Sequence, residues 1–349
     1  MLPFLSLRII ALLLVLAPIY FAGAQSPAYR YFRLGNSNPS HSAFHSGFAL
    51  MGGGKDLDEA FRWLCDRSGR GDVLVLRATG DDDYNPYIKK LCRLNSVATL
   101  IIPDRGAADD PFVAKTISEA SALFIAGGDQ ANYINFWMAT PVQTALNDAI
   151  HRGVPIGGTS AGLAVLGEYA YTAQGDKPDD ADLNSKLAMS NPFGSRVTLV
   201  RGFLNIPILQ GIITDTHFAK RDRMGRLLAF LARLNEPDGK LAPPAAPHVR
   251  GIGVEQGAAV LLEPDGNAKV IGHGSAYFID AGDPSGRRIG GKSGAMELDK
   301  PLTFGPFDIQ RVAPGHDFNL RTWSGDATHY TLSINAGVIQ STQPGGALY

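Results

Sequence analysis

The sequence has no excess of basic charge, few cysteines and no metal-binding pattern. Its 32 lysines and arginines stand against 33 acidic residues, and the formal net charge of -1 argues against nucleic acid as a partner. No cluster of Cys, His and carboxylate residues has the spacing of a zinc site, so we expect no metal and no other cofactor. Beyond the first 24 residues, no stretch is apolar enough to cross a bilayer.

Cys65 and Cys92 are the only cysteines. Both lie in segments with helical spacing, where a buried free thiol is common. An exported protein can also join two such residues in a disulfide. The sequence leaves both states open.

Residues 1–24 have the pattern of a secretory signal peptide. Arg8 precedes the apolar run from Ile9 to Ala22, and Ala22-Gly23-Ala24 has the small-x-small pattern of a cleavage site. The run of about 14 residues is short for a membrane span, which needs roughly 20, so cleavage is favoured over an uncleaved anchor. We expect a secreted or periplasmic protein that begins at Gln25 and has no membrane contact after cleavage.

From about residue 45 to 285, short apolar strands alternate with segments of helical spacing. This alternation predicts an α/β fold, with a mostly parallel sheet covered by helices on both faces. Residues 25–44 are expected to be a loose lead-in, 132–149 one long helix, and 286–349 a β-rich C-terminal extension. In such sheets ligands bind beyond the carboxyl ends of the strands, where the loops 52–54, 79–86, 127–131 and 158–161 are expected.

Gly158-Thr159-Ser160-Ala161-Gly162 matches the G-x-S-x-G pattern of a nucleophile elbow. A nucleophile must project from a strained turn, and small neighbours let the chain pass without a clash. The helix that follows directs its first amides at the site, so the amide of Ala161 could stabilise an oxyanion. The alternative is a plain glycine-rich turn capped by Ser160 or Thr159. The strand-turn-helix context favours Ser160 as a nucleophile.

A second segment, Gly127-Gly128-Asp129-Gln130, also ends a strand and opens a helix. The amides of Gly128 and Asp129 could complete an oxyanion hole, and Gln130 could bind substrate. Asp129 could equally serve as the N-cap of the helix.

A serine nucleophile needs a base, and His217 is placed best among the eight histidines because it stands just past a predicted strand end. Arg221 and Arg223 follow it and could bind a substrate carboxylate, or could form a solvated helix face. Arg226 is expected to be a structural ion-pair partner.

Together these segments resemble the cyanophycinases and related aspartyl dipeptidases of peptidase family S51. The resemblance rests on G-G-D-Q at 127–130, G-T-S-A-G at 158–162 and D-x-H-F-x-x-R-x-R-x-G-R-L at 215–227, within roughly residues 45–280. It implies a fold like the class I glutamine amidotransferases, with serine in place of cysteine, and a Ser-His-acid mechanism without metal. The implied substrate is a peptide or a cyanophycin-like polymer.

Residue by residue, the resemblance implies Ser160 as nucleophile and His217 as base. Gln130, Thr216 and the arginines would form the substrate pocket, although cyanophycinases of the common type have glutamine where this chain has Thr216. The acid is implied on a later turn, at Glu255. Asp215, two residues before His217, is the local rival, and Glu168 is a weaker third candidate.

Two other functions stay open at this point. An esterase of α/β-hydrolase type would also have the elbow, but its chain order would make His248 or His273 the base. An amidotransferase-like binding protein would have no catalytic activity. The sequence leaves the oligomeric state open, a homodimer included.

Overall fold

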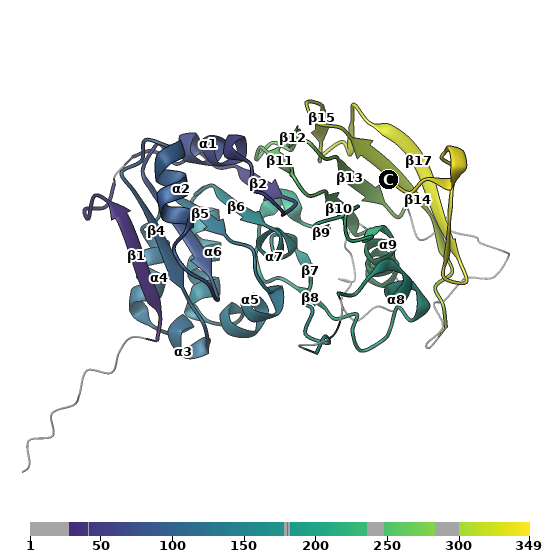
Figure 1. The fold of residues 1–349 in the computed structure, drawn as a ribbon, viewed down its shortest axis with the longest axis horizontal. Helices are drawn as coiled ribbons and strands as arrows, with labels where there is room; N and C mark the ends of the chain where they lie inside the picture. The colour runs from purple at the N-terminus through teal and green to yellow at the C-terminus, as the bar shows by residue number, and fades with distance from the viewer. Residues whose placement is uncertain (1–27, 41, 178–179, 181, 236–247, 283–299) are drawn as a thin grey trace, which may run out of the picture.

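The computed structural model describes residues 28–40, 42–177, 180, 182–235, 248–282 and 300–349 (Figure 1). The predicted signal peptide lies outside these ranges. Within them, none of the helices has both the length and the apolar character that a membrane crossing requires.

The first sheet has ten strands in the order β1-β4-β3-β5-β6-β2-β11-β12-β15-β16. Its centre, from β4 to β2, is parallel, as the alternation of strands and helices predicts. The strands are β1 (Arg30–Gly35), β2 (Phe48–Met51), β3 (Asp72–Arg77), β4 (Ser96–Ile101), β5 (Ala122–Ile125), β6 (Ile156–Thr159), β11 (Ala258–Leu262), β12 (Asn267–Gly272), β15 (Asp317–Asn319) and β16 (Ser324–Gly325).

Both faces of this sheet are buried. Successive side chains of a strand point to opposite faces, so Val73 and Val75 of β3 pack in the core beneath α1 (Asp58–Arg67) and α2 (Tyr84–Leu91). Leu74 and Leu76 belong to the core on the other face. The helices in the chain segments next to that core are α3 (Arg105–Ala108), α4 (Pro111–Ser118), α5 (Gln130–Trp137), α6 (Pro141–His151) and α7 (Ala161–Ala164).

The second sheet has eight strands in the order β18-β17-β14-β13-β10-β9-β7-β8. Its helices are α8 (Ser185–Ser190) and α9 (Met224–Leu234), and α9 is buried along almost its whole length. In Figure 1, α7 lies between the two sheets. The strands are β7 (Tyr169–Tyr171), β8 (Leu199–Arg201), β9 (Ile212–Asp215), β10 (Arg250–Val254), β13 (Ala276–Asp280), β14 (Phe304–Val312), β17 (Thr328–Asn335) and β18 (Val338–Ser341).

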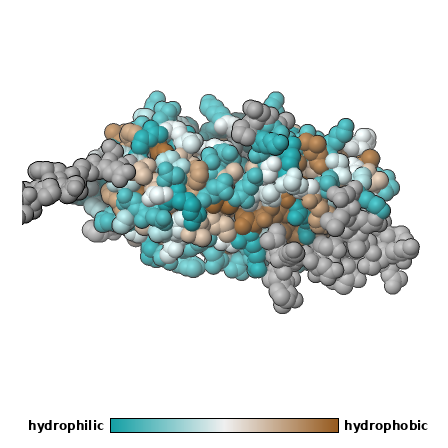
Figure 2. Space-filling view, turned by 90° about the horizontal axis from the view of Figure 1, so that it is seen from below, coloured by the Kyte–Doolittle hydropathy of each residue, from teal (hydrophilic) through white to brown (hydrophobic). Residues whose placement is uncertain are grey.

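One continuous core joins the two sheets. Leu74 of β3, Leu163 of α7, and Ile212 and Ile252 of β9 and β10 belong to the same buried cluster. The described surface is mostly polar, and its large exposed apolar side chains are Leu34, Phe112, Leu187 and Val338. Figure 2 shows an apolar group of residues near the middle of one face, with polar residues next to it.

Two segments differ from the sequence-based expectations. The lead-in contains β1, an edge strand whose backbone pairs with β4, so that polar side chains are tolerated there. The helix expected over 132–149 is two helices, because Ala139 has a φ of +57° and Pro141 begins α6. In the segment expected to be a β-rich C-terminal extension, β14, β17 and β18 continue the second sheet and β15 and β16 continue the first.

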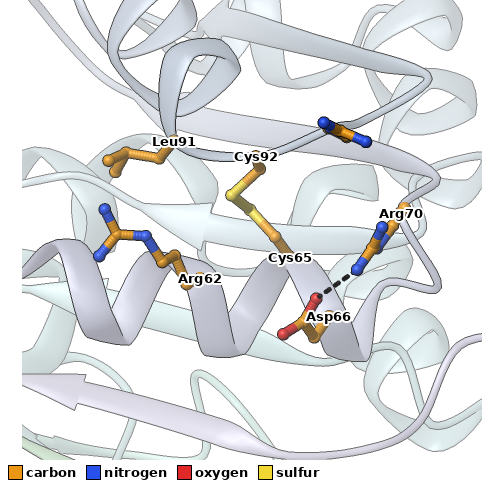
Figure 3. A pocket seen from close by; sticks show the side chains of 7 residues that line it. Arg62, Cys65, Asp66, Arg70, Leu91 and Cys92 are labelled. Atoms are coloured by element: carbon orange, nitrogen blue, oxygen red, sulfur yellow. Dashed lines mark ion pairs between the residues drawn. A yellow bond between two sulfur atoms is a disulfide. The ribbon is translucent and has the colours of Figure 1, made fainter.

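Cys65 on α1 and Cys92, which directly follows α2, form a disulfide with their Cα atoms 6.3 Å apart (Figure 3). Of the two states left open by the sequence, the structure therefore has the bridged one. The bridge fastens the two helices that cover one face of the first sheet.

Replacing both cysteines with alanine should lower the free energy of unfolding by up to about 3.5 kcal/mol, because a cross-link over 27 residues restricts the unfolded chain. Urea unfolding with and without a thiol reductant measures this. Reductant should bring the native protein to the stability of the double variant and leave that variant unchanged. If the reductant does not change the urea unfolding curve of the protein with both cysteines, the bridge is contradicted.

Candidate active site

Ser160 follows β6 in a strained turn, with φ +51° and ψ -119°. Its side chain makes no capping hydrogen bond to α7, so the simple cap expected as the alternative is not formed. The flanking glycines are required by close backbone contacts: a Cβ at Gly162 would lie 2.0 Å from the carbonyl oxygen of Ile125, and one at Gly158 would lie 2.6 Å from the backbone of Gly162. The elbow therefore exists with the geometry that its pattern indicates.

His217 stands two residues past β9 and faces Ser160. Its Nε2 lies 2.7 Å from Ser160 Oγ, and its side chain is almost completely buried. The residue has a φ of +49°, and its backbone amide donates to the carbonyl of Gly52 at 2.8 Å. Loop 52–54 thus fixes the histidine from the first sheet, although His217 itself comes from the second.

Gly53 is in closest contact with this pair. A Cβ there would lie 2.5 Å from both Cε1 and Nε2 of His217, and 3.1 Å from the Cβ of Ser160. The sequence indicated that loop 52–54 ends a strand at the right edge of the sheet, but it gave no sign that His217 packs on this glycine.

The residue beside the other ring nitrogen is Gln256, whose Nε2 lies 2.5 Å from His217 Nδ1. Glu255, which was expected beside Nδ1, points away from the imidazole ring. Its carboxylate accepts hydrogen bonds from the amide of Ser275 at 2.8 Å and the hydroxyl of Tyr277 at 2.7 Å. Glu255 and Gln256 follow β10 in the turn before β11, where their side chains contact different partners. The expectation that Glu255 contacts His217 is therefore wrong in this geometry.

Neither rival carboxylate replaces it. Asp215 is buried and accepts from Arg226, with Oδ2 2.7 Å from Nε. Glu168 accepts from Arg201 at 2.7 Å and from the backbone of Gly211. Arg226 is thus the structural ion-pair partner that the sequence led us to expect.

Arg221 and Arg223 converge on one carboxylate, Asp182, at 2.7 and 2.9 Å. Arg223 is buried and also donates to the carbonyl and hydroxyl oxygens of Thr216. Among the described residues, its buried Nε has no hydrogen-bond partner. The guanidinium therefore has one N–H donor without a partner among these residues. The carboxylate of Asp182 occupies the position at which we expected the carboxylate of a substrate.

The charges around the site are shifted accordingly. Burial, followed by the positive charges of Arg221 and Arg223, lowers the pKa of His217 to about 4, so the imidazole is neutral at neutral pH, as a general base must be. Burial and neighbouring Arg226 lower the pKa of Arg223 to about 10. Burial opposes ionisation of Asp182, but Arg223 and Arg221 outweigh it and lower the pKa of this carboxyl group.

Ser160, Arg221 and Arg223 line a cleft with a volume of about 510 Å³. The other residues expected in the oxyanion hole and the substrate pocket line it as well. Gly128, Asp129 and Gln130 come from the turn between β5 and α5, and Ala161 comes from the elbow. Asp129 also caps α5, because its side chain accepts from the amide of Ala131 at 2.9 Å. Its side-chain role is therefore the cap that the sequence allowed, while its amide stays available for the site.

The site thus combines strand ends of both sheets. Loops after β2, β5 and β6 supply Gly53, Gly128 and Ser160, and those after β9 and β10 supply His217 and Gln256. A serine paired with a buried neutral histidine is an arrangement that can carry out acyl transfer.

Comparison with known proteins finds a family that matches part of the chain. Residues 48–190 match the model of peptidase family S51. This match supports the assignment of the chain to peptidase family S51. The chain is a serine-type peptidase, and its fold is of the α/β class predicted from the sequence.

Cyanophycinases of Synechococcus elongatus and Thermosynechococcus vestitus are each 26% identical to this S51 peptidase over 311 residues, which are 85% of this chain and 86% of theirs. A crystal structure of a peptidase from an acI-B1 Actinobacterium superimposes with a TM-score of 0.49 and 15% identity, over 80% of this chain and 98% of that one.

Proposed function

We propose that this S51 peptidase is an exported exopeptidase of cyanophycinase type, with Ser160 as nucleophile and His217 as base. The observation that carries the proposal is the 2.7 Å contact between Ser160 Oγ and His217 Nε2, made by two residues with positive φ. Ser160 attacks an amide carbonyl while His217 accepts its proton, and His217 then protonates the leaving amine.

The oxyanion of the tetrahedral intermediate is assigned to backbone amides. The amide of Ala161 belongs to the elbow, and those of Gly128 and Asp129 belong to the neighbouring strand end. Gln130 and Thr216 line the cleft beside them and are assigned to the substrate. The fold is proposed to be of the class I glutamine amidotransferase type.

Two observations support export. The first 24 residues have the pattern of a signal peptide. The bond between Cys65 and Cys92 is of a kind that persists in oxidising compartments. Intact-mass analysis of the protein from culture medium and periplasm should give a chain that begins at Gln25, and a mature protein that retains Met1 would contradict export.

The proposed substrate class is supported by the relatives, which are cyanophycinases. Incubation of the purified protein with cyanophycin, followed by mass spectrometry, should show release of aspartyl-arginine dipeptides. Intact polymer after prolonged incubation, together with cleavage of other acidic peptides, would leave the peptidase assignment and remove cyanophycin as substrate.

The esterase alternative requires another base. His248 pairs with Asp280, its Nε2 lying 2.8 Å from Oδ1, and the histidine in contact with Ser160 is His217. Replacing His217 with alanine should therefore abolish cleavage of peptides and esters alike, whereas the same change at His273 should preserve both activities.

Replacing Arg223 with alanine should lower kcat/KM for acidic peptides by roughly ten- to a hundredfold, because an arginine–carboxylate pair in a partly desolvated site contributes about 1.5 to 3 kcal/mol. A neutral ester substrate should lose less, because it is affected only by the loss of the hydrogen bonds that Arg223 donates to Thr216 and Asp182. Arg201, which pairs with Glu168, is the matched control. Equal losses on acidic and neutral substrates would mean that Arg223 maintains the fold and does not bind the ligand.

A further inference from the structure

Gln256 has the position that a carboxylate has in a Ser-His-acid mechanism. Its amide nitrogen lies 2.5 Å from His217 Nδ1, while Nε2 of the same ring lies 2.7 Å from Ser160 Oγ. The three side chains therefore form one hydrogen-bonded series, in which the imidazole is held at both nitrogens.

The carboxylates nearest the histidine are all engaged elsewhere. Glu255 accepts from Tyr277 and from the backbone of Ser275. Asp215 is paired with Arg226, and Asp182 with Arg221 and Arg223. Within the described ranges, no carboxylate oxygen is hydrogen-bonded to His217, so an amide is the only side-chain group that orients its Nδ1.

We infer that Gln256 is the positioning residue of this peptidase in place of an acid, and that the orientation of its amide selects the tautomer of His217. The inference rests on the proposed roles of Ser160 and His217. To accept the proton of Ser160, Nε2 must be unprotonated, and Nδ1 then carries the hydrogen. That hydrogen needs an acceptor, which the amide oxygen of Gln256 supplies after half a turn of the amide.

The orientation in the structure corresponds to the other tautomer. Here the amide nitrogen of Gln256 faces Nδ1, and because an amide nitrogen can only donate, this orientation matches the tautomer in which His217 Nε2 carries the hydrogen. Turning the amide therefore changes the Ser160–His217 pair from a form in which Nε2 carries the hydrogen to a form in which Nε2 can accept the proton of Ser160. A carboxylate in this position would accept only, and would hold the reactive tautomer permanently.

The charges facing His217 fit a neutral partner. Arg221 and Arg223, from the turn after β9, lower its pKa, and burial lowers it further. Asp215 at the end of β9 and Asp182 before α8 act in the opposite direction but are neutralised by arginines. An uncharged amide at Nδ1 adds no negative charge to stabilise the imidazolium, so the base stays unprotonated well into the acid range.

The test compares the native protein with Gln256→Glu, Gln256→Met and the matched control Glu255→Gln. The protonation and tautomer of His217 are followed by NMR on protein labelled with ¹⁵N-histidine, with the resonance assigned from a His217→Gln sample. Gln256→Glu should raise the pH of the His217 titration by about one to three units and fix the hydrogen on Nδ1. Glu255→Gln should leave the titration in place.

This measurement needs no substrate, so it stays informative if the proposed peptidase activity is not found. An unchanged titration in Gln256→Glu, or a shift produced by Glu255→Gln, would overturn the inference. Kinetics provide the second arm: the acidic limb of kcat/KM should move with the titration. Gln256→Met, similar in length but without hydrogen-bonding groups, should lower kcat by about ten- to a hundredfold at constant KM. Unchanged kcat in that variant would also overturn it.

Discussion

Replacing Ser160 with alanine is expected to lower kcat by about four orders of magnitude or more. Without its hydroxyl the protein has no atom to form the acyl intermediate, and His217 has no proton to accept. Binding of substrate to the arginines and the backbone amides should persist, so KM should change little. Active-site labelling by a serine-directed phosphonate should disappear together with activity.

The fold should survive this change. Alanine is smaller than serine and removes only the contact with His217, so thermal melts of the two proteins should nearly coincide. Ser190→Ala is a suitable control, since its hydroxyl bonds the carbonyl of Leu187 on α8. Near-native turnover in the Ser160 variant, with the control equally active, would refute the nucleophile assignment.

Replacing Gly53 with alanine should lower kcat/KM by about a hundredfold or more. The new Cβ would lie 2.5 Å from His217 Nε2, so the imidazole must move, and a displacement of about 1 Å in a reacting group costs on the order of a hundredfold. The backbone is also strained for alanine, because Gly53 has a φ of +90°. This strain should cost about 1 to 2 kcal/mol of stability.

Gly202→Ala separates the two effects. Gly202 has a φ of +78°, and a Cβ there would have no atom within 4 Å. It should therefore lose comparable stability while keeping full activity, as measured by urea unfolding and peptide hydrolysis. Similar activity in the two variants would show that contact with His217 is unimportant at position 53.

The site residues known before the structure were those with local signals. Ser160 was indicated by the glycines around it, because only small residues allow the turn between β6 and α7. His217 was indicated by its place after β9. Asp182, in contrast, had no signal, since it meets Arg221 and Arg223 from 39 and 41 residues away.

The side chain at Nδ1 of His217 could not be identified from the sequence. Glu255 and Gln256 follow β10 as neighbours, and the resemblance implied the acid of the two. Which of two consecutive side chains faces His217 depends on how β10 pairs with β9 and β13 and on the turn after it. Those pairings join residues far apart in the chain.

The sequence by itself determined the α/β class, the buried parallel strands and the nucleophile elbow, because apolar periodicity and glycine requirements are local properties. Only the tertiary structure decided that the C-terminal strands extend both sheets, that Cys65 and Cys92 are bonded, and that Gln256 meets the histidine. Each of these depends on long-range backbone pairing and close packing, and these fix the direction of a side chain only once the whole chain has folded.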